Sequence, residues 1–246
     1  MSKPKSNTLF HFTKTNDVLC NILKNGFFPR YSIEEIKYLD GIFEKVAIPV
    51  VCFCDIPLSR ISDHVDFYGH FGLGMTREWC ITNGLNPVQY VTSNSLYLKN
   101  FKAIWIASII GERSDIKDTA LASLISMYSF HKPLFGEVVI TGKPIEKEFY
   151  QESEWRYLAV PKEHKFIFDD KIVNDTSILK KHNDRIQNEC ALRFTPKDIK
   201  YIFVKSDSDI PDVVNFINKE LDIYPSADLK ILLSRITSLG AIEADI

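Results

Sequence analysis

Near the start of the chain, short apolar blocks alternate with turn residues. Residues 9–13 are apolar except for His11, and this pattern predicts a short strand. The residues after Thr13 place apolar side chains three and four positions apart, which predicts a helix that ends at Gly26. A second helix is expected over residues 32–39.

The rest of the chain continues this mixture of strands and helices. Runs of β-branched and apolar residues predict strands at 46–56, 71–75, 88–91, 103–106, 137–141, 154–160 and 201–204. Apolar residues at helical spacing predict helices at 58–68, 76–80, 116–130 and 210–221. These elements predict a protein with a mixed fold of helices and strands.

Composition and charge narrow the class of protein without naming a partner. The chain has 246 residues, of which 45% are hydrophobic and 25% charged, as in a globular protein that buries a core. Its formal net charge of −2 gives no general attraction to nucleic acid or to anionic lipid. The sequence still allows a local basic groove, because net charge does not say where the charges lie.

Cysteine usage and apolar runs indicate the compartment. The five cysteines are odd in number and irregularly spaced, so we expect reduced thiols rather than a disulfide framework. Residues 1–8 lack the apolar run of a signal peptide, and no apolar stretch is long enough to span a bilayer. We therefore expect a soluble, cytoplasmic protein with no membrane partner.

His11 is the first residue that can carry chemistry. A histidine inside an apolar strand is either hydrogen-bonded for structural reasons or functional, and taken alone the structural interpretation is favoured. Thr13 follows it, just before the expected helix. The free N–H groups and the positive dipole end of that helix N-terminus suit a phosphate.

A second polar group lies in the run from Gln151 to Arg156. On a strand, Glu152, Glu154 and Arg156 share one face, where two carboxylates repel each other unless they are paired, separated or exposed. A solvated edge strand with an ion pair is the plainer interpretation. The functional interpretation is a carboxylate held for catalysis, with Arg156 fixing its position.

Two further groups point less specifically to a ligand. Cys52 and Cys54, followed by scattered histidines, have suitable atoms for zinc, but their spacing matches no recognised zinc site, so we expect no bound metal. Arg30 and Tyr31 stand between two expected helices. An arginine there can bind phosphate with two hydrogen bonds, although a surface arginine needs no such role.

Four motifs together resemble the AbiGi family of abortive-infection, or phage-defence, proteins. They are LFHFT at residues 9–13, CFCDIPLS at 52–59, YGHFGLGMTREW at 68–79 and ESEWRY at 152–157. The C-terminal pattern around residues 198–204 and 229–236 belongs to the same resemblance, which therefore covers nearly the whole chain. The family is customarily labelled an antitoxin component, which implies a partner toxin protein.

The order of the polar residues also resembles the ADP-ribosyltransferase fold, above all the DarT-like toxins. This resemblance implies an α+β fold with a split, mostly antiparallel sheet flanked by helices. Residues 1–164 would form the core of this fold, and residues 165–246 an α/β extension packed on that core.

The same resemblance implies that NAD is the substrate and that His11 contacts its ribose. Thr13 and Arg30 would serve the phosphates. Tyr68, with Tyr31 in reserve, would stack on nicotinamide.

The same resemblance assigns catalysis to a late glutamate, here Glu154 with Glu152 as its companion. The carboxylate would stabilise the oxocarbenium-like ribose that forms when nicotinamide leaves. The chain departs from the DarT-like pattern, because it has neither a serine-threonine-serine strand nor an obvious DarT signature.

Functions from different classes follow from these observations. The first is an NAD-dependent ADP-ribosyltransferase toxin of a phage-defence system. It would modify a macromolecule, with RNA or DNA favoured, and it would need an antitoxin partner. The second is a non-catalytic antitoxin or regulator that binds a toxin protein. Metal-dependent nuclease chemistry through the cysteines and histidines is a third and weaker hypothesis.

Overall fold

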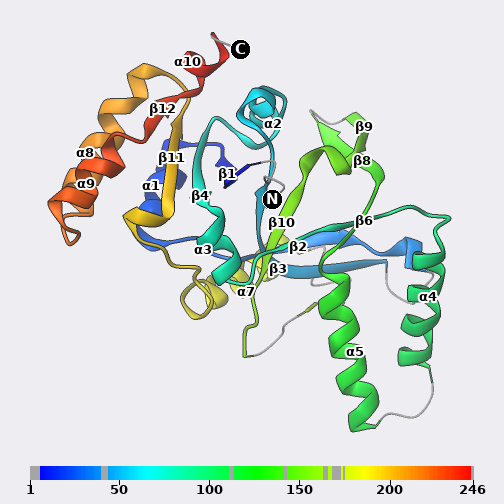
Figure 1. The fold of residues 1–246 in the computed structure, drawn as a ribbon. Helices are drawn as coiled ribbons and strands as arrows, with labels where there is room; N and C mark the ends of the chain where they lie inside the picture. Colours follow the sequence, from blue (N-terminus) through cyan, green and yellow to red (C-terminus); the bar gives the residue numbers. More distant parts are fainter. Residues whose placement is uncertain are drawn as a thin grey trace, which may run out of the picture. The chain divides into compact units, whose positions relative to one another are not determined.

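The structure is a computed structural model and describes residues 6–39, 44–110, 114–140, 143–162, 166–167, 173 and 175–244. Contacts within the chain divide it into two units, whose elements are labelled in Figure 1. Unit 1 consists of Met1–Phe28, Cys52–Leu85 and Ala191–Ile246, and unit 2 of Pro29–Val51 and Asn86–Cys190. The chain therefore passes between the units repeatedly, and strand β3 (Lys45–Cys54) contributes to both.

The sheet of unit 1 is built around two antiparallel strands, β1 (Thr8–Thr13) and β4 (Phe71–Thr76). Strand β11 (Ile199–Val204) pairs antiparallel with the other edge of β4, and β12 (Ile236–Ser238) runs parallel to β11. The end of β3 completes the order β12-β11-β4-β1-β3. Segments from the beginning, the middle and the end of the chain thus form one set of hydrogen-bonded strands.

The helices of unit 1 pack on this sheet or on one another. In the described part of the chain they are α1 (Asn16–Asn25), α2 (Ile61–Tyr68), α3 (Arg77–Thr82), α8 (Ile210–Glu220), α9 (Ser226–Leu233) and α10 (Leu239–Glu243). Helix α1 begins after Thr15, whose side chain caps its first turn, and ends at Gly26, whose φ of 79° favours glycine. Phe10, Phe12 and Phe203 lie in a buried cluster with residues of α2 and α10.

The strands of unit 2 are short and mostly antiparallel. Strand β2 (Arg30–Glu35) pairs with the first part of β3, and β10 (Glu154–Leu158) pairs with β5 (Asn86–Pro87). The other pairs are the parallel strands β6 (Gln89–Val91) and β7 (His131–Pro133), and the hairpin of β8 (Phe135–Ile140) and β9 (Lys143–Glu148).

Helices of unit 2 have different surroundings. Helices α4 (Leu96–Ile109) and α5 (Asp115–Tyr128) pack against each other (Figure 1). Helix α7 (Thr176–Glu189) packs on β2 through a buried cluster that includes Tyr31 and Ile186. Among the described residues, no helix is both long and apolar enough to cross a membrane.

Two predicted elements were wrong. Residues 32–39, predicted as a helix, form most of β2 and a 3-10 turn, because pairing with β3 overrides the local spacing of apolar residues. Residues 103–106, predicted as a strand, lie inside α4, since a short apolar run is compatible with either structure. The predicted strand at 137–141 corresponds to β8, although residue 141 lies outside the described residues.

The mixed α+β class and the mostly antiparallel sheet are confirmed. The boundary that we expect near residue 164 falls inside the sequence range of unit 2. The units are defined by contacts within the chain, which do not test whether a core is followed by an extension packed on it. The division into residues 1–164 and 165–246 therefore stays a prediction.

Candidate functional site

A group of charged side chains is buried in unit 2 around the start of β10. The 3-10 turn Phe149–Glu152 leads into the strand through Ser153, whose φ of 45° is left-handed. No other non-glycine residue in the described part of the chain has a positive φ. Because Ser153 interrupts the extended backbone, Glu152 belongs to the turn and Glu154 to the strand.

Lys132 of β7 joins the two carboxylates. Its Nζ lies 2.6 Å from Glu152 Oε2 and 2.9 Å from Glu154 Oε2. Lys147 of β9 places its Nζ 2.8 Å from the other oxygen of Glu152. These cations offset the repulsion that two neighbouring carboxylates would otherwise suffer.

Arg156 holds the other side of Glu154. Its Nε lies 2.7 Å from Glu154 Oε1, and its Nη2 lies 2.9 Å from Glu34 Oε1 on β2. Its Nη1 donates a hydrogen bond of 2.8 Å to the carbonyl oxygen of Ser129. We refer to the charged residues of this group as the carboxylate cluster: Glu34, Lys132, Lys147, Glu152, Glu154 and Arg156.

The carboxylate cluster is largely removed from solvent. Arg156 is 1% exposed, Glu152 5% and Glu154 6%. Burial by itself would lower the pKa of Lys132, but Glu154 and Glu152 together raise it above its ordinary value, so the ammonium stays charged. The interpretation as a solvated edge strand is wrong, because these side chains are buried and β10 lies between β3 and β5.

Tyr90 of β6 fixes the backbone at the same place. Its hydroxyl oxygen accepts a hydrogen bond of 2.8 Å from Glu154 N. Burial raises the pKa of Tyr90 well above its ordinary value, so the hydroxyl stays protonated at neutral pH. Glu154 is therefore held at its backbone by Tyr90 and at its carboxylate by Lys132 and Arg156. A carboxylate held in this way can stabilise positive charge that develops beside it.

His11 lies in the middle of β1 in unit 1, and its ring is hydrogen-bonded. Its Nδ1 lies 2.8 Å from the carbonyl oxygen of Cys52, and since a carbonyl only accepts, Nδ1 is the donor. The ring contacts Phe27 and Phe53, at centroid distances of 5.0 and 5.5 Å. Burial lowers the pKa of His11 despite this hydrogen bond, which favours the neutral ring. The structural interpretation accounts for these contacts, and contact with an NAD ribose stays a prediction.

The other predicted residues of unit 1 lie at the ends of elements. Thr13 is the last residue of β1 and pairs with Phe71 on β4. The helix N-terminus that follows it is capped by the side chain of Thr15. Tyr68 ends α2, where its ring stacks on His64 at a centroid distance of 4.4 Å. The roles of Thr13 and Tyr68 toward NAD stay predictions.

Arg30 and Tyr31 begin β2 in unit 2. Arg30 is exposed, whereas Tyr31 is buried. The backbone N–H of Tyr31 donates to the side-chain oxygen of Asn183 on α7, and its ring lies 6.0 Å from that of His182. Tyr31 thus packs as a core residue against α7, and its use as the reserve stacking ring stays a prediction.

The cysteine motif contributes to packing in unit 1. Among the described residues, no three side chains of histidine, cysteine, aspartate or glutamate are grouped so that they could hold a metal ion. The cysteines are free thiols, and Cys54 lies in the buried cluster of Phe10 and Phe203. Asp55 in the same motif pairs instead with Arg77 of the next motif, through Nη2 and Oδ2 at 3.0 Å.

The structure brings Glu152 and Glu154 together with residues that sequence reasoning missed: Glu34, Tyr90, Lys132 and Lys147. They come from β2, β6, β7 and β9, so only the pairing of distant strands collects them. The sequence around each of these residues does not identify it as part of a site. The one available signal was indirect, since two close carboxylates require cations from elsewhere.

Comparison with known proteins identifies the family. A family model described as "Putative abortive phage resistance protein AbiGi, antitoxin" matches residues 25–205. "Abortive phage resistance protein AbiGi" of Lactococcus lactis subsp. cremoris is 32% identical, and the alignment covers 89% of this chain and 99% of that protein. No solved structure matches the chain. These matches confirm the resemblance drawn from the four motifs, and the chain belongs to the AbiGi family of abortive phage resistance proteins.

Proposed function

We propose that this chain is an NAD-dependent ADP-ribosyltransferase of an abortive-infection system, acting in the cytoplasm on a macromolecule, with nucleic acid favoured. The carboxylate cluster carries the proposal. Burying ion pairs is often no better for stability than an apolar core, and perturbed charged groups gather at functional sites. The left-handed Ser153 between the two carboxylates is a second support, since backbone strain also gathers at such sites.

Glu154 would be the carboxylate that faces the ribose. The C1′–N bond of NAD breaks, and nicotinamide leaves with the electron pair. The ribose then carries positive charge, which Glu154 stabilises. A nitrogen or oxygen of the acceptor bonds to C1′ and gives up its proton to Glu154 or to water. Lys132 and Arg156 act as positioning residues, because each contacts an oxygen of Glu154.

The remaining residues of the proposal bind NAD. His11 is assigned to the ribose, as the resemblance to DarT-like toxins implies. Thr13, which precedes a helix N-terminus, and Arg30 are assigned to the phosphates. Tyr68, with Tyr31 in reserve, is assigned to nicotinamide. Glu152 is the companion of the catalytic carboxylate. Alanine variants measured for NAD binding test each assignment separately.

Transfer of label from NAD tests the activity. The full chain is incubated with NAD labelled in its adenylate phosphate and with DNA, RNA or cell lysate. We expect labelled product, and a loss of roughly 100-fold in rate in Glu154→Gln, which keeps the shape of the side chain but removes its charge. Glu146→Gln, at an exposed carboxylate outside the cluster, is the matched control. The proposal is wrong if the wild-type chain neither binds NAD nor transfers label to any acceptor.

A non-catalytic antitoxin that binds a toxin protein is the second candidate function. The family description favours it, and so do helices α4 and α5. Apolar side chains on these helices and at their ends are more than half exposed: Leu96, Ile104, Ile110, Ile116 and Met127. Single exposed apolar residues are ordinary, but a set on one helix pair is typical of an interaction surface.

Expression in cells distinguishes the two candidates. A toxin stops growth when expressed alone, and Glu154→Gln relieves the arrest. An antitoxin is harmless alone and rescues cells from its toxin. In the second case, Ile104→Glu with Ile116→Glu abolishes rescue while the free energy of unfolding changes by less than about 0.5 kcal/mol. Ile231→Glu, at a half-exposed position on α9, should leave rescue intact.

A further inference from the structure

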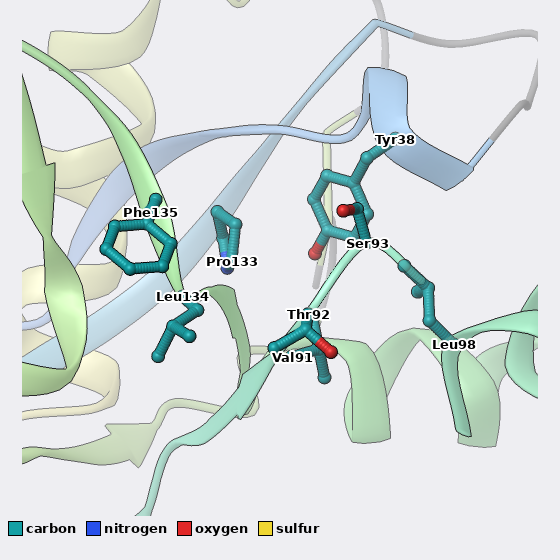
Figure 2. Close-up of a pocket in the computed structure, with 8 residues that line it drawn as sticks. All are labelled: Tyr38, Val91, Thr92, Ser93, Leu98, Pro133, Leu134 and Phe135. Carbon is teal, nitrogen blue, oxygen red and sulfur yellow. The ribbon is translucent and has the colours of Figure 1, made fainter. Parts of the chain in front are cut away.

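A cavity of about 250 Å³ opens in unit 2 beside strands β6 and β7 (Figure 2). Its walls come from Tyr38 in the 3-10 turn after β2, from residues 91–93, from Leu98 on α4 and from residues 133–135. None of these lining residues belongs to the carboxylate cluster or has a role in the proposed function. The cavity is therefore a feature that the ADP-ribosyltransferase reaction proposed above does not use.

The lining is neutral and mostly apolar. Hydroxyl groups come from Tyr38, Thr92 and Ser93, and the other lining side chains are aliphatic or aromatic. Burial raises the pKa of Tyr38 to about 12, so its hydroxyl is protonated at neutral pH. That hydroxyl lies 3.3 Å from the hydroxyl of Tyr128. The lining can thus exchange hydrogen bonds with a ligand but cannot neutralise a charged one.

Size and shape narrow the class of ligand. A cavity of about 150 Å³ holds one benzene ring, so this larger space accommodates one or two fused rings. Figure 2 shows the side chains that line the cavity, which include the aromatic rings of Phe135 and Tyr38. Flat aromatic faces favour a flat aromatic partner through offset or edge-on contacts.

The register of β6 and β7 separates this cavity from the carboxylate cluster. Tyr90 pairs with Lys132, and both side chains reach Glu154. The next pair, Val91 and Pro133, lines the cavity. The cavity and the contacts of Glu154 therefore use different residues of the same two strands.

We propose that this cavity binds a small, neutral, aromatic molecule of one or two fused rings. The proposal goes beyond the ADP-ribosyltransferase and antitoxin functions, since it requires neither NAD nor a protein partner. A neutral ring replaces water along the apolar walls, which is favourable in proportion to the apolar area covered. An anion of the same shape loses its hydration and finds no counter-charge among the lining side chains.

Titration of the full chain with indole tests the proposal, with indole-3-carboxylate as the charged counterpart. Binding is followed by ligand-observed NMR and by calorimetry. We expect saturable binding of indole and affinity for the carboxylate that is at least about tenfold weaker. Ser93 is exposed and lines the cavity, so Ser93→Trp adds a ring that competes for this space and should weaken indole binding by about tenfold or more.

Asn94→Trp is the matched control, because it adds the same ring one position along the same exposed turn but outside the lining. It should bind indole as the wild type does. Phe135→Ala, at a half-exposed wall residue, provides a second variant that should also weaken binding. Absence of saturable indole binding overturns the proposal. Equal binding by wild type, Ser93→Trp and Phe135→Ala also overturns it, as does an equal loss in Ser93→Trp and Asn94→Trp.

Discussion

Arg156 makes hydrogen bonds to groups from different parts of unit 2. Its guanidinium contacts Glu154 on its own strand, Glu34 on β2 and the carbonyl of Ser129 after α5. The ion pair with Glu154 follows from the alternation of the strand and is confirmed. Its burial could not be predicted, because Glu34 and Ser129 approach only through the folding of distant segments.

Removing this guanidinium should be costly. In Arg156→Met, Glu154 loses one of its cations and the partly buried Glu34 loses its ion-pair partner. We expect the free energy of unfolding to fall by about 3 kcal/mol or more, measured by chemical denaturation. Adding Glu154→Leu to Arg156→Met should recover part of the loss, because the second change removes an uncompensated charge.

A surface ion pair gives the matched control for this prediction. Lys180 and Asp184 lie one turn apart on α7, both more than half exposed, with 2.6 Å between their charged atoms. Lys180→Met should lower the free energy of unfolding by no more than about 0.5 kcal/mol. If Arg156→Met and Lys180→Met lower the free energy of unfolding by similar amounts, burial does not make the Arg156 ion pairs more important for stability.

His131 should make the protein sensitive to acid. Burial lowers its pKa to about 4, while its Nε2 lies 2.6 Å from the Tyr97 hydroxyl and its Nδ1 is buried without a hydrogen-bond partner among the described residues. The unfolded chain binds this proton near pH 6.5, so stability present above that pH is lost as the pH falls toward 4. At pH 5 the loss is about 2 kcal/mol.

The measurement compares unfolding free energies at pH 7 and pH 5 for the wild type and His131→Phe. Phenylalanine keeps a ring against Phe101, whose centroid is 4.5 Å from that of His131, but takes up no proton. The variant should lack the part of the acid dependence that His131 causes. Parallel acid dependence in both proteins would show that another group is responsible.

At the scale of elements, the sequence predicted those strands and helices that have a clear spacing of apolar residues and clear turn residues of their own. Strand β1, helix α1 with its Gly26 terminus and helix α8 all follow from apolar spacing and turn residues. Strand β2 did not, because its structure depends on pairing with β3. Helix α4 was mistaken in part for a strand, since its apolar residues occur on all sides and obscure the helical period.

Close approach of β1 and β4 provides a prediction for one glycine. A methyl group at Gly72 would lie 2.6 Å from His11 O and 2.7 Å from a ring carbon of Phe12. Gly72→Ala should therefore lower the free energy of unfolding by about 1–3 kcal/mol, as overpacking does in other cores. Thermal and chemical denaturation measure the effect.

Gly240→Ala is the control. Gly240 lies in α10, where the nearest atom to an added methyl group is Lys205 O at 3.6 Å, an ordinary contact. Alanine there should leave stability unchanged or raise it by up to about 1 kcal/mol, because glycine costs backbone entropy in a helix. If Gly72→Ala leaves the free energy of unfolding unchanged, β1 and β4 can move apart to accommodate the methyl group without losing stability.

At the scale of the whole molecule, the motifs predicted the family, and the comparisons confirm it. The motifs could not predict how the chain is shared between the two units. That arrangement depends on β11, which follows most of the chain yet pairs with β4 in unit 1. No local property of residues 199–204 identifies their partner strand.

A fragment of residues 1–164 should fail to fold. It contains β1 and β4 but lacks β11, and it loses Phe203 from the buried cluster that holds Phe10 and Phe12. We expect weak near-ultraviolet circular dichroism and poorly dispersed amide signals, whereas the full chain gives sharp spectra. Cooperative unfolding of the fragment would instead support an independent core that ends near residue 164.

The late position of β11 has a consequence for synthesis on the ribosome. Strands β1 and β4 emerge early, but one edge of β4 stays unpaired until β11 is translated, more than a hundred residues later. During that interval the nascent chain presents unpaired backbone groups beside apolar side chains, which invites association with other chains. Slow translation should therefore lower the yield of active protein, and chaperones that bind nascent chains should raise it.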